Sequence, residues 1–495
     1  MLKFFIDSRE VAAVEGMTIL QAALASGIEI PHFCYHSAFE PEGSCRMCLI
    51  EIEGMPKLEL ACSTRVKEGM RVFTAKARVE EARREVLEFL LAEHPLDCPI
   101  CDKAGECRLQ DYYERYGRYS ARFREPREAR AKIISIGRGL ILDRERCVLC
   151  TRCVRFLREV AGAGELGIFA RGVRSELGLY EDRMIDNDYS GNLAEICPVG
   201  AITDRDFRFR TRPWRLKKGD SICPHCGRGC NIVVEFEPDS DRSGVARKVF
   251  RIRAKENPKV NGPWICDLGR YARSYLNELR GERVIMNKAG ETIRTTWEEA
   301  LGVLSAKLRG LRAASRGRGL GLILSTFLSN EELRFIRRIF ADAFKDGNVW
   351  FADPKPGRSD SLLLTEERSP NVRGARELGF DPIPPDLETI SKKAGLLLVF
   401  GTGLLFHYPA DEIQRALGRV PAKFLFSAHA GWLDTVMDFV LPTALFSEKS
   451  GTLTNTEGIV QSFGPVFAPP GKARPDSDIL GELAGISVET GEGAL

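Results

Sequence analysis

All 15 cysteines of this 495-residue chain lie between Cys34 and Cys266, and the last 229 residues contain none. A secreted disulfide scaffold would be short, with an even number of cysteines spread along it. Clustered thiols in a chain of this length are more typical of metal binding, because thiolates bind both iron and zinc. The spacing within each group of cysteines then indicates which metal is held.

The first group is Cys34, Cys45, Cys48 and Cys62, with ten, two and 13 residues between successive members. A loop cysteine, a close pair and one distant cysteine form the arrangement in which a ferredoxin holds a [2Fe–2S] cluster. Gly43, just before the pair, allows the backbone to approach inorganic sulfide closely. The alternative is a zinc site built on the close pair. The strand–helix–strand pattern before Cys34 favours the cluster.

The second group is His94, Cys98, Cys101 and Cys107, directly after a segment with helical periodicity. One imidazole and three thiolates suit zinc and a [4Fe–4S] cluster equally, so the spacing alone does not decide between them. An imidazole carries less negative charge than a thiolate. It should therefore raise the reduction potential of a cluster that it binds.

The third group is Cys147, Cys150 and Cys153, followed after 43 residues by Cys197 and a proline. Bacterial two-cluster ferredoxins contain two C-x2-C-x2-C-x3-C-P runs, and the fourth cysteine of each run binds the other cluster. Here the first run lacks its fourth cysteine, and the second run keeps only that one. The cysteine positions that have been replaced are Leu157, Asn187, Ser190 and Leu193. One complete ligand set remains, so this group predicts a single [4Fe–4S] cluster rather than zinc.

The fourth group is Cys223, Cys226 and Cys230, followed later by Cys266. The family resemblance described below implies that this group holds a third [4Fe–4S] cluster. The four groups use every cysteine, with His94 as the sixteenth ligand, and leave no thiol for a disulfide or for nucleophilic catalysis. His225 lies between two ligands of this group but is not needed, and we expect it near the site or at the surface.

Hydrophobic periodicity predicts the elements that position these groups in the N-terminal half. Apolar runs around a short helix at Thr18–Ser26 indicate a small α+β module, with Gly27 at the end of the helix. Lys76–Glu93 has helical periodicity with Val79 and Leu87 on one side. Residues 110–131 form a charged connector, and strands follow the fourth group's first cysteines within 220–280.

From about residue 283 the pattern changes to strands that alternate with helices, which indicates a parallel sheet covered on both faces. Ser329 and Glu332 form a capping box that opens a helix running through Phe344. The proline-rich segment 351–390 has little periodicity and is predicted to be a surface loop. The predicted buried strands are 319–326, 394–401 and 424–428.

Composition and charge exclude several classes of protein. Hydrophobic residues make up 44% and charged residues 28%, as in an ordinary globular protein. The net charge is only +3, from 72 basic and 69 acidic residues, so nothing suggests nucleic-acid binding. The longest strongly apolar stretch, Ala394–Phe406, is too short to span a bilayer, and the N-terminus lacks an export signal. We expect a cytoplasmic protein without direct membrane insertion.

The cysteine motifs resemble those of the large iron–sulfur subunit (the G subunit) of bacterial NADH:quinone oxidoreductase, respiratory complex I. The resemblance covers nearly the whole chain and is most specific in SCRMCLIEIEG, HPLDCPICDKAGECRLQD, CVLCTRCVRF, SGNLAEICPVGAI and CPHCGRGC…WICDLGR. It implies an α+β multidomain protein with a β-grasp [2Fe–2S] ferredoxin module, a ferredoxin-like [4Fe–4S] module and a truncated molybdopterin-oxidoreductase-like α/β domain without molybdenum. The expected domains are 1–75 for the [2Fe–2S] module, 76–130 for the His/Cys3 cluster, 131–215 for the ferredoxin-like cluster, 216–282 for the fourth group and 283–495 for the α/β domain.

The resemblance also implies a function as an electron-relay subunit with no substrate-converting site of its own. Its expected partners are a flavin subunit that binds NADH, a thioredoxin-like [2Fe–2S] subunit, and downstream subunits of a quinone module or a nickel–iron hydrogenase. It implies that the His94 and Cys147 clusters form the main electron line, that the [2Fe–2S] cluster lies near its start and that the fourth cluster lies off it.

This chain departs from the family in length, because the tail motif FVLPTALFSEKSGTLTNTEGIVQSFGP follows the first α/β unit after only about 100 residues. The same subunit has shortened relatives in soluble NAD-linked and electron-bifurcating hydrogenases. The sequence is therefore equally compatible with a complex of that kind and with complex I at the cytoplasmic face of the membrane.

The enzyme alternative is a molybdenum or tungsten formate dehydrogenase, which shares this architecture. Such an enzyme needs a metal-ligating side chain beyond the cluster, and no thiol follows Cys266. In such enzymes a lysine lies two residues after the last cluster cysteine, where this chain has Leu268. The turn Gly401–Gly403 could cradle a phosphate, but a simple turn after a strand explains it better. A zinc-structured scaffold or nucleic-acid module is the other alternative, and the near-neutral charge weighs against it.

Overall fold

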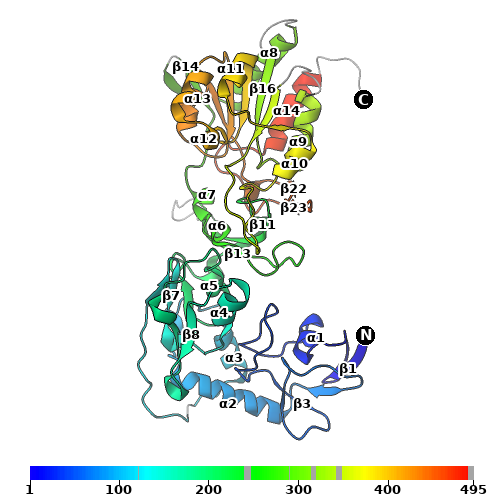
Figure 1. The fold of residues 1–495 in the computed structure, drawn as a ribbon, viewed down its shortest axis with the longest axis vertical. Helices are drawn as coiled ribbons and strands as arrows, with labels where there is room; N and C mark the ends of the chain where they lie inside the picture. Colours follow the sequence, from blue (N-terminus) through cyan, green and yellow to red (C-terminus); the bar gives the residue numbers. More distant parts are fainter. Residues whose placement is uncertain (121, 239–246, 289, 314–318, 342–347, 489–495) are drawn as a thin grey trace. The chain divides into compact units, whose positions relative to one another are not determined.

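The structure is a computed structural model that describes residues 1–120, 122–238, 247–288, 290–313, 319–341 and 348–488. The chain forms two compact units, Met1–Leu216 and Lys217–Leu495. Figure 1 shows the first in blue to cyan-green and the second in green to red. None of the described helices is both long enough and apolar enough to cross a membrane.

The N-terminal module is a five-stranded mixed sheet packed with one helix. Its strand order is β2-β1-β5-β3-β4, in which β1 and β5 are parallel and the other pairs are antiparallel. Helix α1 (Ile19–Ala25) begins at Thr18, which forms a capping box with Gln21, and Gly27 follows it with φ +70°. The predicted helix is confirmed, and its apolar residues share a core with the sheet. The strands are β1 (Leu2–Ile6), β2 (Arg9–Ala13), β3 (Leu49–Ile52), β4 (Glu59–Leu60) and β5 (Arg71–Phe73).

Two helices bracket the second cysteine group. Helix α2 (Ala77–Glu93) buries Val79 and Leu87, as its periodicity predicted, and it ends at His94. Helix α3 (Arg108–Tyr116) begins directly after Cys107 and packs against α2. The predicted charged connector therefore begins inside a helix. A short 3-10 turn, η1 (Cys98–Ile100), lies between the two helices.

The remainder of the first unit is a small three-stranded antiparallel sheet of order β10-β7-β6, with short helices that hold the third cysteine group. Helix α4 (Arg152–Arg155) contains Cys153 and continues as a π turn, Phe156–Val160. Helix α5 (Asn192–Ile196) ends at Cys197. The strands of this region are β6 (Ile134–Gly137), β7 (Leu140–Leu142), β10 (Ile202–Asp204) and the separate hairpin β8 (Leu166–Phe169) and β9 (Glu176–Leu179).

The second unit begins with a three-stranded antiparallel sheet that carries the fourth cysteine group. Strands β11 (Lys217–Ile222), β12 (Asn231–Glu237) and β13 (Lys248–Ala254) lie in that order, and the last two match the predicted strands. Helices α6 (Asp267–Arg270) and α7 (Arg273–Asn277) follow Cys266. A late hairpin, β22 (Gly451–Thr454) with β23 (Val460–Phe463), belongs to the same unit.

The rest of the second unit is an eight-stranded sheet of order β15-β14-β21-β20-β19-β16-β17-β18. The six strands from β21 to β18 in that order are parallel, as predicted, but the hairpin β14–β15 joins β21 antiparallel, so the sheet is mixed. The short connection between β14 and β15 allows only antiparallel pairing of those two strands, whereas parallel neighbours need longer crossover connections. The strands are β14 (Ile285–Lys288), β15 (Glu291–Arg294), β16 (Gly319–Ser325), β17 (Asn348–Ala352), β18 (Asp381–Pro382), β19 (Ala394–Phe400), β20 (Lys423–Ser427) and β21 (Phe439–Pro442).

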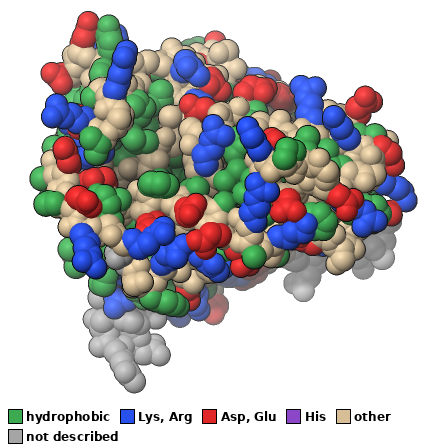
Figure 2. All heavy atoms as spheres, turned by 90° about the horizontal axis from the view of Figure 1, so that it is seen from below, with side chains coloured by type: hydrophobic (Ala, Val, Ile, Leu, Met, Phe, Trp, Pro, Cys, Tyr) green, Lys and Arg blue, Asp and Glu red, His purple; other side chains and the backbone are tan. Residues whose placement is uncertain are grey.

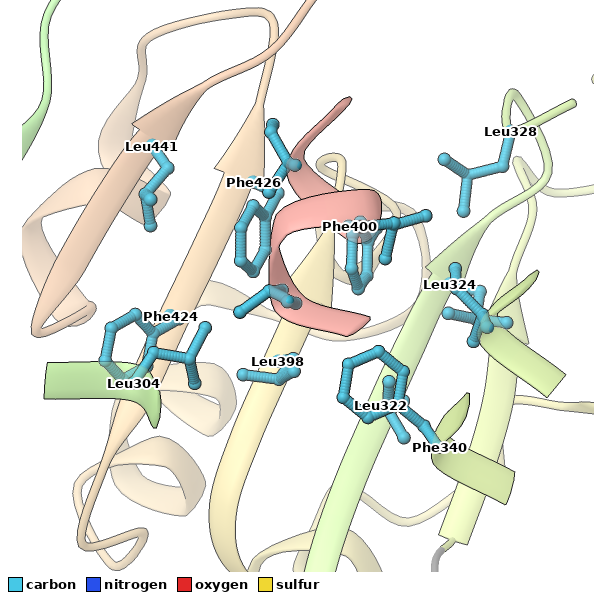
Figure 3. Packing of buried hydrophobic residues seen from close by; sticks show 14 of the residues in the cluster. Leu304, Leu322, Leu324, Leu328, Phe340, Leu398, Phe400, Phe424, Phe426 and Leu441 are labelled. Atoms are coloured by element: carbon cyan, nitrogen blue, oxygen red, sulfur yellow. The ribbon is translucent and has the colours of Figure 1, made fainter. Parts of the chain in front are cut away.

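Helices cover both faces of this sheet, as expected for parallel strands joined by crossovers. One apolar core lies under α8 (Trp297–Ala313), α9 (Asn330–Ile336), α10 (Val372–Glu377) and α14 (Asp476–Val488). The other lies under α11 (Leu387–Lys393), α12 (Leu404–His407) and α13 (Ala410–Leu417). Figure 3 shows the first core, where Phe400 and Phe426 from neighbouring strands stack with ring centroids 4.7 Å apart.

Helix α9 and segment 351–390 differ in how well the sequence predicted them. The capping box of Ser329 and Glu332 opens α9 as predicted. The helix continues as a π turn, Arg337–Ala341, and its predicted end at Phe344 lies outside the described residues. The prediction of a surface loop at 351–390 is wrong. This segment contains α10 and β18 and buries Leu363, Val372 and Leu387 in the domain, because tertiary packing compensates for its weak periodicity.

Candidate metal centres

The first group occupies the loops that flank β3 and β4, and all four thiols are buried, at most 9% exposed. The Cys45 thiol hydrogen-bonds to Cys34 and lowers the pKa of Cys34 to about 5, while the same bond raises the pKa of Cys45. Cys48 and Cys62 form an equivalent pair. Gly43 has φ +69°, and a Cβ there would lie 2.9 Å from the Leu60 side chain. The fold thus brings together all four predicted ligands and encloses them tightly.

The second group lines one small cavity of about 50 Å³, closed by α2 on one side and α3 on the other. His94, Cys98, Cys101 and Cys107 all face this cavity. The Nδ1 atom of His94 is buried without a hydrogen-bond partner, and burial lowers its pKa to about 4, so the ring is neutral at pH 7. Burial also raises the pKa of Cys107 to about 11. A neutral imidazole with an unused nitrogen beside three thiols is a donor set suited to a metal centre.

Gly200 closes this cavity from the loop after Cys197. A Cβ at Gly200 would lie 2.5 Å from the Cys101 sulfur, closer than real side chains approach. Arg146 also lines the cavity and holds Asp97 through two bonds of 2.6 and 2.8 Å. Position 200 therefore requires glycine because a side chain has no space there, and not because of its backbone conformation.

The third group is assembled from the loop before α4 and the end of α5. Burial raises the pKa of Cys147 to about 12 and that of Cys150 to about 11, and neighbouring thiols of the group add to the effect. Cys197 acts electrostatically on the other three cysteines, so the fold brings the distant member of the group close to them. Leu157, where a two-cluster ferredoxin has a cysteine, is fully buried in the apolar core.

The fourth group gathers at one end of the β11–β12 pair. The backbone N–H of Cys223 donates to the Cys230 carbonyl at 2.8 Å, which closes the turn, and Cys266 is the residue that opens α6. Burial and the neighbouring thiols raise the pKa values of Cys223 and Cys230. A Cβ at Gly269 would lie 2.7 Å from the Cys223 sulfur. All four predicted ligands are thus brought together.

Two side chains beside the fourth group behave differently from ligands. His225 packs edge-on against Tyr275, with ring centroids 5.4 Å apart, and burial lowers its pKa to about 4. It lies near the site, as predicted. Leu268, in the place of a bridging lysine, is 47% exposed.

Left-handed residues within the cysteine loops were not predicted from the sequence. Arg46, Leu149 and Thr151 have φ between +50° and +59°, although none is glycine. Each lies inside a ligand motif, where consecutive N–H groups of a left-handed turn form a concavity suited to anionic sulfur. Such conformations cost free energy and persist only where the surrounding structure imposes them. The pattern of residue types carries no signal for them.

These observations fit iron–sulfur clusters better than isolated thiols. None of the 15 cysteines forms a disulfide, and burial raises the pKa of most of them, so a thiolate there needs a nearby cation. Within the described part of the chain, no three His, Cys, Asp or Glu side chains converge on a position that would hold one metal ion.

Family profiles match the chain along most of its length. Residues 1–77 match a 2Fe-2S iron-sulfur cluster binding domain, and residues 83–122 match an NADH-ubiquinone oxidoreductase-G iron-sulfur binding region. Residues 137–203 match the ferredoxin-like domain of NADH-quinone oxidoreductase subunit 3. Residues 216–278 match a molybdopterin oxidoreductase Fe4S4 domain and 383–486 a molybdopterin oxidoreductase domain. The chain is therefore of the class of multidomain iron–sulfur proteins with a molybdopterin-oxidoreductase-like fold.

Curated relatives narrow this class. The chain is 38% identical over 351 residues to NADH-quinone oxidoreductase G subunit 2 of Rhizobium meliloti (strain 1021), which covers 70% of this chain and 40% of that protein. It is 38% identical over 312 residues to the NADH-quinone oxidoreductase G subunit of Rickettsia conorii (strain ATCC VR-613 / Malish 7), covering 63% of this chain and 45% of that one. The chain is a homologue of NADH-quinone oxidoreductase G subunits, the resemblance that its motifs predicted. Its matched region spans less than half the length of these relatives.

A solved structure is also similar. The crystal structure of NAD+-reducing [NiFe]-hydrogenase in the H2-reduced state contains a chain 34% identical in sequence, with a TM-score of 0.39. The match covers 42% of this chain and 90% of that chain.

Proposed function

We propose that this chain is an electron-relay subunit that carries single electrons from a subunit binding NAD(H) and flavin to a downstream acceptor. The observation that carries the proposal is the partition of the ligands. Fifteen cysteines and His94 form four separate, enclosed groups with none left over. Homology to NADH-quinone oxidoreductase G subunits supports a place in a multi-subunit NADH-oxidising complex.

One [2Fe–2S] and three [4Fe–4S] clusters would accept and release electrons singly. The first group would hold the [2Fe–2S] cluster, and each of the other groups would hold one [4Fe–4S] cluster. The chain's own residues hold the thiolates at fixed spacing, keep water from them through burial, and set their potential through ligand type and nearby charge. Neither hydride transfer nor substrate conversion is assigned to this chain, so a flavin partner must split the electron pair.

The chain is divided into five modules, one for each ligand group and one for the α/β domain. We assign 1–75, 76–130, 131–215, 216–282 and 283–495 as separate modules, supported by five family matches that each fall almost entirely within one of them. The break between the two compact units falls at Leu216, one residue from the proposed end of the third module.

The α/β domain acts as a scaffold without a pterin. A cavity of about 100 Å³ lies at the carboxyl ends of its parallel strands, lined among others by Ser325, Gly401, Gly403 and His429. Strand order reverses there between β16 and β19, where ligands of open α/β sheets bind. Sites for drug-sized ligands measure about 300–1,000 Å³, so this cavity is too small to enclose two pterin nucleotides. A formate dehydrogenase would require them.

The partners are other electron-transfer subunits. We assign a flavin subunit that binds NADH, a thioredoxin-like [2Fe–2S] subunit, and either a quinone module or a nickel–iron hydrogenase. Figure 2 shows basic and acidic side chains interspersed over the face that it presents. Nucleic-acid binding would instead favour one broad basic surface.

The test is to purify the tagged chain anaerobically with its native partners and to identify them. We expect a flavin-containing partner to co-purify, and NADH to reduce clusters of this chain as seen by EPR. Molybdenum or tungsten in stoichiometric amount, together with formate oxidation, would show that the formate dehydrogenase alternative is right. Stoichiometric zinc with little iron would contradict the relay altogether.

A further inference from the structure

Two arginines on the short helix α4 are almost completely buried. Arg152 is 5% exposed and Arg155 is 4% exposed, although arginine is rarely buried unless it is paired. Both lie in the third cysteine motif, and Cys153 stands between them. Their guanidinium groups, however, reach the loop of the first group, more than 100 residues away in the sequence.

Arg152 joins the backbone of two different ligand loops. Its Nη2 donates a hydrogen bond to the carbonyl of Tyr35, the residue after Cys34. Its Nη1 donates to the carbonyl of Ile196 at 3.3 Å, the residue before Cys197. One side chain therefore links a loop of the first centre to a loop of the third centre, next to a proposed ligand in each.

Arg155 reinforces the link on the side of the first centre. Its Nη2 donates to the carbonyl of Cys34 itself, and its Nη1 donates to the carbonyl of Glu40 at 2.9 Å. Its Nε lies 3.4 Å from the Glu42 carboxylate, which also accepts a hydrogen bond from Thr151. The charge of Arg155 thus has a carboxylate partner.

Arg152 lacks such a partner. Among the described residues no carboxylate forms an ion pair with it, and its buried Nε has no hydrogen-bond partner. The negative groups that act on it are the sulfurs of Cys150, Cys197 and Cys34. Since an isolated buried charge is costly, the thiolates of the two centres are the counter-ions that make this position tolerable.

We propose that Arg152 is a positioning residue that fixes the spacing of the first and third centres and stabilises the reduced state of both through its charge. The inference rests on the proposed cluster ligands. The observation behind the inference is not the partition of the cysteines. It is a buried cation that is bonded to both ligand loops and balanced only by their sulfurs. Reduction adds negative charge to a centre, so a cation between two centres favours electron uptake by each.

The test uses the full chain with its clusters, in potentiometric EPR titrations of three variants. Arg152→Gln removes the charge, Arg152→Lys keeps the charge but loses the forked donor group, and Arg158→Gln is the control. Arg158 lies further along the same segment but is 69% exposed and pairs with Glu159. We expect Arg152→Gln to lower the reduced-to-oxidised ratio of both centres at least about tenfold at a fixed potential, equivalent to 59 mV for one electron. Arg152→Lys should keep both potentials nearer the wild-type values but alter the spin–spin interaction between the two reduced centres.

Unchanged potentials in Arg152→Gln with all clusters present would overturn the charge effect. An unchanged spin–spin interaction in Arg152→Lys would overturn the positioning effect. If Arg152→Gln does not assemble fully, selective loss of the first and third centres supports the proposal, whereas equal loss of all four contradicts it. The wild-type chain is measured first, because absence of cluster signals there would refute the proposed function and not this role of Arg152.

Discussion

Among single residues, His94 is the proposed ligand that distinguishes one centre from the others. Its ring is neutral, buried and equipped with an unpartnered Nδ1, and it lines a cavity with three thiols. A neutral ligand leaves the centre with one negative charge fewer than four thiolates would. The second centre should therefore have a higher potential than the same site with four cysteines.

Replacing His94 tests this assignment. His94→Cys should retain a cluster but lower its potential, because a thiolate adds negative charge to the ligand shell. Potentiometric EPR of the variant measures the shift. His407→Cys introduces a thiol in the other unit, where the ring bonds to the Asp353 carbonyl, and should leave every potential unchanged. If no potential moves in His94→Cys, His94 is not a ligand.

Position 200 has no space for a side chain, because the sulfur of the proposed ligand Cys101 lies beside it. Gly200→Ala would place a Cβ 2.5 Å from the Cys101 sulfur, so we expect selective loss of the second cluster, about four iron atoms per chain. Gly164→Ala is the matched control, since a Cβ there meets nothing within 4 Å. Iron analysis and EPR of both variants give the result. A full complement of iron in Gly200→Ala would mean that Cys101 can move away or does not bind.

At the scale of elements, a buried ionic group joins two helices of the C-terminal domain. The Lys449 ammonium lies 2.7 Å from Glu332 of α9 and 2.7 Å from Asp476 of α14, and all three side chains are almost fully buried. One cation thus balances two carboxylates. Burial raises the pKa of Asp476 to about 6 even in this arrangement.

Removing the cation should leave two uncompensated buried acids. We expect Lys449→Met to lower the free energy of unfolding by about 3–5 kcal/mol at pH 8. An acid whose pKa is higher in the folded state destabilises the fold as pH rises through its titration range. The loss should therefore be smaller at pH 5, where Asp476 can hold a proton. Urea unfolding at the two pH values measures it.

Lys392→Met is the control for this experiment, because Lys392 is 67% exposed and pairs with Glu388 on its own helix. It should change stability by less than about 0.5 kcal/mol. Equal losses at pH 5 and pH 8 in Lys449→Met would contradict the ionic explanation and favour simple loss of packing.

Segment 351–390 is a packed part of the α/β domain and not the surface loop that its sequence pattern predicted. Segment 351–390 contributes an edge strand, one helix and the start of another to the α/β domain, and Asn371, fully buried, bonds the Leu328 carbonyl and the Thr454 N–H. Its deletion would remove part of the core rather than a partner loop.

At the scale of the whole molecule, the four ligand groups predict the metal content. The chain should contain about 14 iron atoms, two in a [2Fe–2S] cluster and four in each of three [4Fe–4S] clusters. Iron and zinc analysis of anaerobically prepared protein tests the number, and sulfide analysis supplies an independent count. About ten iron atoms would indicate that one of the three larger groups holds none, and the variants above would identify it.

The amino-acid sequence was enough to propose the ligand sets and to predict several local elements. Close spacing within each motif predicts a cluster-binding loop, and local signals such as the capping boxes of Thr18 and Ser329 define where helices begin. The long strands of the α/β sheet were also predictable, since a continuous apolar run has few other uses in a globular domain. These features depend on residues only a few positions apart.

Features that depend on contacts between distant segments became visible only in the folded structure. It shows that Cys62, Cys197 and Cys266 join their groups, and that Arg152 bonds a carbonyl 117 residues away. It also decided the antiparallel edge hairpin, the buried 351–390 segment and the left-handed residues within the cysteine loops. The physical reason is the same in each case. Burial, charge balance and imposed backbone strain arise when separate segments pack together, and no local pattern of residue types encodes them.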